Sequence, residues 1–214
     1  VDAELITTNV EEVRLDVKIQ RFKDIAIAYN LVEGGGARMH NAKISLGVDS
    51  IRVSGSEAAL EDLGDKLVVG TINLGDIPQD TTQSYPVVLP EGVTNLSGVT
   101  SVEIDIKFEG LSNKQILLRD FKTINVPEGM EVQFTTKALE IVVRGPTSAM
   151  LKLDADDVVA TVDFTGAELG STETYRVTIS FGGSVKDVGA VGSYQVVATL
   201  IPIPEPEAET EPTE

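Results

Sequence analysis

The sequence has no cysteine, no tryptophan and one histidine, His40, among its 214 residues. Without cysteine there can be no disulfide, no thiol nucleophile and no thiolate metal site. A single histidine excludes a multi-histidine metal site, and any Ser-His-Asp arrangement would have to use His40. We therefore expect no catalytic, metal-binding or cofactor-binding residues, and a hydrolase is the least favoured class.

Aromatic residues are also scarce, at 5%, and no run of about 18 apolar residues is present. Apolar types still make up 42% of the chain, so it can build a core, which should be aliphatic and thin. Nothing in the sequence is long and apolar enough to span a bilayer, and no signal peptide is visible. Because the chain opens with Val1 rather than methionine, we interpret it as a trimmed segment of a longer protein.

Positive charge is in short supply as well. Lys and Arg number 17 against 34 Asp and Glu, which gives a net charge of -17. The basic residues are scattered singly, so no patch offsets the repulsion of phosphate backbones or anionic lipid. We expect neither a nucleic-acid partner nor direct binding to an anionic membrane surface.

The most informative feature present is an internal repeat between residues 51–89 and 141–179, ninety positions apart. Of the 39 aligned positions, 11 are identical, and many others are conservative. The identical pairs are Ile51/Ile141, Val53/Val143, Gly55/Gly145, Ala59/Ala149, Leu63/Leu153, Val68/Val158, Val69/Val159, Thr71/Thr161, Thr82/Thr172, Tyr85/Tyr175 and Val87/Val177. The chain therefore contains two copies of one module of about 90 residues.

Most of each copy is predicted to be β-strand. Residues 102–108 alternate apolar and charged side chains, as residues 13–19 do, which is typical of a strand with one solvated face. Similar alternation over 25–31, 44–48, 85–89 and 175–181 predicts further strands. Glycine- and proline-rich turns separate them at 34–36, 90–92, 127–129 and 182–183.

One short helix interrupts each copy. Residues 56–63 and 146–153 predict about two turns each, with Gly55 or Gly145 at the preceding bend and Pro146 at the first helical position. Leu60 and Met150 should pin these helices to their sheets.

The ordered set of motifs resembles the YbbR-like domain family. In the second copy the set comprises residues 141–146, the short helix, residues 159–166 and then a strand containing Tyr175 and Val177. In the first copy the matching segments are residues 51–55 and 69–75. The resemblance covers about residues 13–201. The first copy departs more from the family, because Ser56 follows Gly55 where proline is usual and Asn73 stands where aspartate is usual. Val48 and Ala138 stand where the family often has proline.

The resemblance implies a mainly β, elongated molecule of tandem modules, each made of short twisted sheets with one short helix. We expect a lead-in strand or the end of an upstream module at 1–20, modules at 13–108 and 102–201, and an acidic Pro/Glu-rich tail at 202–214 that is extended.

The resemblance also implies a role. The family's tandem modules lie outside the bacterial cytoplasmic membrane, anchored through a segment that this sequence lacks. The best-known members resemble regulators of the membrane diadenylate cyclase, which makes cyclic di-AMP. We therefore expect non-enzymatic interaction modules with a protein partner. The alternative is a cell-surface structural spacer or a module that adheres to envelope polymer.

The remaining candidate sites have simpler interpretations. His40 is interpreted as an exposed loop residue. Asp154, Asp156 and Asp157 open like a calcium loop but lack its glycine and its final glutamate, so they indicate a charged turn. The three glycines at 34–36 lack the Lys-Ser/Thr of a phosphate loop and predict a mobile hairpin tip. Residues 95–97 fit the glycosylation pattern, which is common by chance.

Overall fold

The computed structural model describes residues 20–170, 172–182 and 186–203, and the fold is mainly β. The first part of the chain contains β1 (Arg21–Val32), β2 (Ala42–Leu46), β3 (Ser50–Gly55), α1 (Glu57–Leu63), β4 (Lys66–Asn73), η1 (Leu74–Asp76), β5 (Thr81–Pro86), β6 (Val93–Asn95) and β7 (Ser101–Phe108). The second part contains β8 (Leu111–Leu118), β9 (Phe121–Ile124), β10 (Met130–Phe134), β11 (Leu139–Pro146), α2 (Thr147–Met150), η2 (Ala155–Asp157), β12 (Val158–Asp163), β13 (Thr172–Phe181), β14 (Gly189–Val191) and β15 (Tyr194–Pro202).

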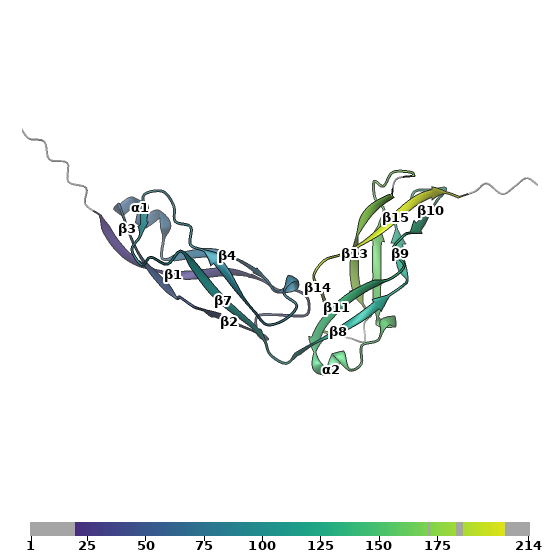
Figure 1. Ribbon diagram of the computed structural model, residues 1–214, viewed down its shortest axis with the longest axis horizontal. Helices are drawn as coiled ribbons and strands as arrows, with labels where there is room; N and C mark the ends of the chain where they lie inside the picture. The colour runs from purple at the N-terminus through teal and green to yellow at the C-terminus, as the bar shows by residue number, and fades with distance from the viewer. Residues whose placement is uncertain (1–19, 171, 183–185, 204–214) are drawn as a thin grey trace, which may run out of the picture.

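These elements form two lobes that meet end to end (Figure 1). The N-terminal lobe comprises β1 to β7, and the C-terminal lobe comprises β8 to β15. Each lobe has its own cluster of buried apolar side chains. The prediction of a mainly β, elongated molecule with one short helix in each half is confirmed.

Two sheets enclose the core of the N-terminal lobe. Their strand orders are β4-β1-β3-β6 and β2-β7-β5. The alternation predicted for residues 102–108 is present in β7, where Val102, Ile104 and Ile106 are buried and the charged residues between them are exposed. Period-2 patterning therefore decides which face of each strand enters the core.

The C-terminal lobe repeats these strand pairings. The parallel pair β1–β4 corresponds to β9–β12, and the antiparallel pairs β1–β3, β2–β7 and β5–β7 correspond to β8–β11, β10–β15 and β13–β15. The register repeats too, because Tyr85 lies opposite Val102 and Tyr175 lies opposite Val196. The repeated sequence thus forms a repeated pattern of strand pairing.

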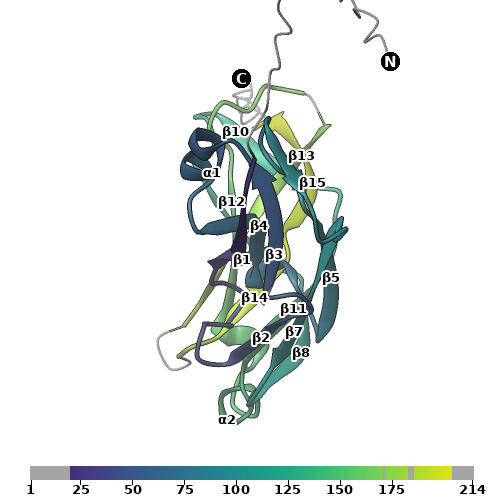
Figure 2. The same cartoon turned by 90° about the vertical axis from the view of Figure 1, so that its left-hand side faces the viewer.

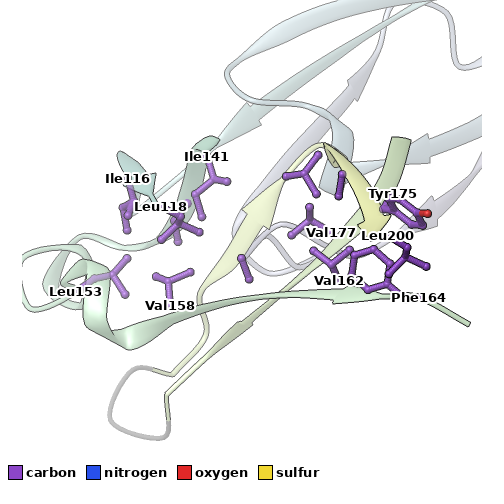
Figure 3. Close-up of a cluster of buried hydrophobic side chains, with 14 of the residues drawn as sticks. Ile116, Leu118, Ile141, Leu153, Val158, Val162, Phe164, Tyr175, Val177 and Leu200 are labelled. Carbon is purple, nitrogen blue, oxygen red and sulfur yellow. The ribbon is translucent and has the colours of Figure 1, made fainter. Parts of the chain in front are cut away.

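The core of the C-terminal lobe runs its full length (Figure 3). Ile116, Ile141 and Leu153 lie at one end, and Phe164 and Tyr175 lie at the other. These side chains come from both sheets and from the connections between them, so a single apolar layer holds the lobe together.

The helices differ from the sequence prediction in their ends. Helix α1 is capped by Ser56, whose side chain accepts a hydrogen bond from the backbone N–H of Ala59. Helix α2 is only one turn long, and Pro146 occupies its N-cap rather than its first helical position. Leu60 and Met150 are buried as predicted. Figures 1 and 2 place α1 at the outer end of its lobe and α2 beside the link between β7 and β8.

Two predicted strands were placed wrongly at one end. β5 ends at Pro86 instead of continuing through 89, and β2 ends at Leu46 instead of continuing to 48. Past Pro86, the Val87 N–H still donates to Thr100 O at 2.9 Å, but Pro90 has no N–H to offer a longer ladder.

The domain boundaries at 13–108 and 102–201 stay a prediction. The strand predicted at 13–19 and the tail beyond residue 203 lie outside the described residues. The shared stretch 102–108 is hydrogen-bonded to β2 and β5, both in the N-terminal lobe.

Candidate functional site: the junction between the lobes

The junction between the lobes is organised around Arg144, which is 1% exposed and ranks first by volume among the fully buried side chains. Arg144 lies near the end of β11, in a run where Val143, Arg144 and Gly145 are all buried. Its strand belongs to the C-terminal lobe, but its guanidinium reaches into the N-terminal lobe.

Four backbone carbonyls of the N-terminal lobe hold this guanidinium. Nε donates to Gly35 O at 2.8 Å, and Nη1 donates to Ile77 O at 2.6 Å. Nη2 donates to Leu74 O at 2.6 Å and to Gly34 O at 3.2 Å. Four of the hydrogen bonds that a guanidinium can donate are therefore made to the neighbouring lobe.

Local backbone geometry presents these carbonyls. The triple glycine forms a tight turn closed by the bridge between Gly34 and Ala37, in which Gly35 and Gly36 have φ of 55° and 73°. Glycine adopts such angles without steric cost. A Cβ on Gly36 would also lie 2.0 Å from Arg144 O, so the turn packs closely against β11.

The 3-10 turn η1 and its C-cap residue, Ile77, supply the other two carbonyls. Asn73 caps it by accepting the backbone N–H of Gly75 at 3.1 Å. The Leu74 carbonyl, which accepts from the Ile77 N–H at 3.4 Å within the turn, also accepts from Arg144. The Asn73 cap and the tight turn thus orient two carbonyls towards the Arg144 guanidinium.

No carboxylate balances the charge of Arg144, because none of the ion pairs among the described residues includes it. The guanidinium instead lies over the ring of Phe108, with its carbon 4.1 Å from the ring centroid, a favourable cation–π arrangement. Burial lowers the pKa of Arg144 to about 10, so the side chain is still a cation at neutral pH.

Other contacts join the lobes around the arginine. The Gly192 N–H donates to Gly75 O at 2.7 Å, and Asn113 Nδ2 donates to Pro78 O at 2.6 Å. An exposed ion pair links Arg38 Nη2 and Asp187 Oδ1 at 3.5 Å, and such pairs contribute little. A groove of about 360 Å³ opens beside Arg144 and is lined by Pro78, Gln79, Asp80, Phe108, Leu111 and Asn113.

The predicted candidates mostly lie elsewhere. His40 is exposed in a turn. The carboxylate of Asp157 accepts the backbone N–H of Asp154 at 3.0 Å, as part of the turn that leads into β12. Asn95 donates to Val99 O and accepts from the N–H of Ser97, so its side chain closes a local turn.

The triple glycine is the clearest correction. The sequence predicted a mobile hairpin tip, but residues 34–36 are packed at the junction and contribute two of its four acceptors. The importance of Arg144 was missed altogether. A weak signal existed, because an arginine follows the apolar run at 141–143 where the first copy has Ser54.

Two further observations concern the described residues only. None of their helices is long and apolar enough to cross a membrane. Within the same ranges, no group of three or more histidine, aspartate and glutamate side chains is placed to hold a metal ion.

No protein-family model matches the chain, and no curated protein matches it. A crystal structure of a YbbR-like protein from Streptococcus pneumoniae is similar over 89% of this chain and 100% of its own, with 14% identity and a TM-score of 0.32. A solution structure of a protein from Streptococcus thermophilus is similar over 44% of this chain and 92% of its own, with 17% identity and a TM-score of 0.34. The first carries the family name that the sequence resemblance suggested.

Proposed function

We propose that this chain is a tandem of YbbR-like interaction modules that lies outside a bacterial cytoplasmic membrane and regulates a membrane diadenylate cyclase. The modules are the segments 13–108 and 102–201, preceded at 1–20 by a lead-in strand or the end of an upstream module and followed by an acidic tail at 202–214. The chain is not an enzyme in this proposal, and its anchor is a segment outside this sequence.

One observation carries the proposal: the family motifs recur ninety residues apart and form the same strand pairings in both lobes. The chemistry of the junction supports a binding role. Its buried polar contacts join a guanidinium to carbonyls, and such a set offers neither a nucleophile nor a general base.

The regulatory mechanism is differential binding. The lobes bind one conformation of the cyclase's external or membrane-flanking segments more tightly than another, and so shift the balance between them. Strands at sheet edges can supply the contact by pairing with an extended segment of the partner. Strands β4 and β8 are edge strands that expose Val68 and Leu117, at 51% and 48%.

The test is to express the full-length protein with the cyclase in a host that lacks its own cyclic di-AMP, and to measure the nucleotide. Deleting the lobes should change its level, whereas replacing the exposed Leu169 on a loop with lysine should not. Val68→Lys and Leu117→Lys should reproduce part of the deletion if the edges bind. An unchanged level after deletion of both lobes contradicts the proposal.

A structural spacer or envelope-binding module is the second candidate. It is favoured by the end-to-end arrangement of the lobes across a hydrogen-bonded junction (Figure 1). Saturable retention of the purified chain on cell-wall material, together with an unchanged cyclic di-AMP level, would favour this candidate over the regulator.

A further inference from the structure

We propose that the junction is a two-state device in which residues 109–110 are the hinge and Arg144 is the latch that fixes the angle between the lobes. This inference goes beyond the proposed function, since it holds whichever partner the lobes bind. It rests on the geometry of the link, the contacts of Arg144 and the contrast with Ser54.

The covalent link is short, and its two residues are each bonded to a different lobe, because the Glu109 N–H donates to Asn41 O at 2.9 Å and Gly110 O accepts from the Thr147 N–H at 3.4 Å. β7 ends at Phe108 and β8 begins at Leu111, which leaves Glu109 and Gly110 between the lobes. Gly110 has φ of 71°, and a Cβ there would have no heavy atom within 4 Å. Hinges are often a few such residues at the ends of elements, which absorb a change of backbone angle.

The latch acts from a different part of the chain. Arg144 places four hydrogen bonds on carbonyls of the Gly34–Gly35 turn and of the segment from Leu74 to Ile77. Because one rigid planar group makes all four, a rotation of the lobes breaks them together rather than one by one. The junction therefore favours two discrete arrangements over a continuous range of angles.

The absence of a carboxylate partner for Arg144 among the described residues makes half-open arrangements of the junction still less favourable. A buried cation is stable only while its hydrogen bonds are made, and a half-open junction would leave the guanidinium out of water and the carbonyls unpaired. The open state must expose Arg144 fully to solvent. Close packing of glycine on glycine adds to the effect, because a Cβ on Gly189 would lie 2.3 Å from the backbone N of Gly36.

The latch is specific to this junction and is not a property of the repeat. The residue ninety positions before Arg144 is Ser54, which is 7% exposed and too short to reach a neighbouring lobe. While the latch is closed, the two lobes are held at one angle, and a partner that contacts both lobes binds them in that arrangement.

The absence of cysteine makes the test direct. Spin labels at Glu61→Cys and Glu131→Cys, both exposed and on different lobes, report the separation of the lobes by pulsed electron paramagnetic resonance. The parent protein should give one narrow distance distribution. Arg144→Ala should broaden it roughly twofold or more, and Arg144→Lys should give an intermediate width because one ammonium cannot engage four carbonyls. Arg119→Ala, an exposed arginine in the C-terminal lobe, is the matched control and should change nothing.

A second variant protects the test against misfolding. Gly36→Ala wedges the junction without touching the guanidinium, while Gly98→Ala carries similar backbone strain, with φ of 69°, where nothing lies within 4 Å. Amide exchange in β7 and β15 confirms that both lobes remain folded. The proposal requires broadening in Arg144→Ala and Gly36→Ala but not in the controls. A narrow, unchanged distribution in either of the two junction variants, with both lobes folded, overturns it.

Discussion

The N-terminal and C-terminal lobes share most of their strand pairings but differ along the line that runs between β4 and β5 in the first lobe and between β12 and β13 in the second, a line called the seam below. In the C-terminal lobe, β12 pairs with β13 from Val158 opposite Phe181 to Val162 opposite Val177, and five strands form one sheet. In the N-terminal lobe, β4 and β5 belong to separate sheets. The two strands at the seam are therefore hydrogen-bonded to each other in the C-terminal lobe and lie in separate sheets in the N-terminal lobe.

Local sequence explains the difference. Ser180, which lies opposite Val159 in the β12–β13 ladder, is Pro90 in the first copy, and proline cannot donate to a ladder. A second proline, Pro86, is the last residue of β5. The seam is filled by a side chain instead. A Cβ on Gly70 would lie 2.4 Å from Tyr85 Cδ1, so the absence of a side chain at Gly70 is what admits the tyrosine ring.

The cores differ as well. The buried cluster of the N-terminal lobe is aliphatic, whereas that of the C-terminal lobe includes a row of rings. Phe164 lies between Phe134 and Tyr175, with centroid distances of 6.3 Å and 4.5 Å. The position matching Phe164 is Leu74, and both are fully buried. Sheet closure and aromatic packing thus reinforce each other in one lobe only.

The largest expected effect comes from removing these matched side chains. Phe164→Ala should cost about 3–5 kcal/mol, and Leu74→Ala should cost roughly 1 kcal/mol less, because the phenylalanine loses ring contacts in addition to buried area. Urea unfolding followed by resonances from each lobe measures both losses. Leu169→Ala, at a 55% exposed position, should change stability little. A greater loss from Leu74→Ala would mean that the aromatic row adds nothing.

The seam residues can be exchanged between the lobes. Gly70→Ala should destabilise the N-terminal lobe by about 1–3 kcal/mol because the new methyl collides with the Tyr85 ring. The converse change, Ala160→Gly, should cost the C-terminal lobe only about 0.5–1 kcal/mol through strand entropy. Thermal unfolding of both variants measures the difference. If the collision is the cause, Gly70→Ala should cost much less in a Tyr85→Ser background, and an equal cost in both backgrounds would rule it out.

Replacing two prolines of the first copy should stabilise the edge of β4 rather than weaken it. Replacing Pro86 with arginine and Pro90 with serine copies β13 into the first lobe and should let β5 extend along β4. Amide exchange at the outer edge of β4 should slow by about fivefold, since one added hydrogen bond contributes roughly 1 kcal/mol. Exchange in β12 serves as the internal reference. Unchanged exchange at β4 would show that Tyr85, and not the prolines, keeps the seam open.

The sequence predicted what depends on short-range periodicity. The alternation in β7 placed Val102, Ile104 and Ile106 in the core, and the repeat predicted which segments of the two copies adopt the same shape. The contacts of Arg144 were beyond such reasoning. Its four acceptors lie 67 to 110 positions away in the chain, and they are backbone carbonyls, which every residue possesses.

The glycines at 34–36 are a second case in which local sequence does not predict a long-range contact. Their composition indicates a turn, and the structure has one. The close approach of β11 to Gly36 depends on how two lobes meet, and no local pattern encodes that contact. The shortness of α2 has a similar origin, because a four-residue helix carries little periodic signal.

The smallest expected effect is a difference between the lobes in how their stability depends on pH. Asp163 and Asn73 occupy matched positions and each accepts the backbone N–H two residues later, but only the aspartate titrates. Hydrogen bonds from Asn125 and then from Thr165 lower the pKa of Asp163 below its ordinary 3.8. A carboxylate with a lowered folded-state pKa stabilises the protein above the unfolded pKa, and that contribution is lost as the pH falls through the folded pKa. Asp163→Asn should therefore lower the Tm at neutral pH slightly and reduce its fall below about pH 4, because the amide still accepts from Thr165 but cannot titrate. Melting curves of both proteins from pH 6 down to pH 2 measure this, and parallel curves across that range would show that the Asp163 hydrogen bonds do not distinguish the two lobes.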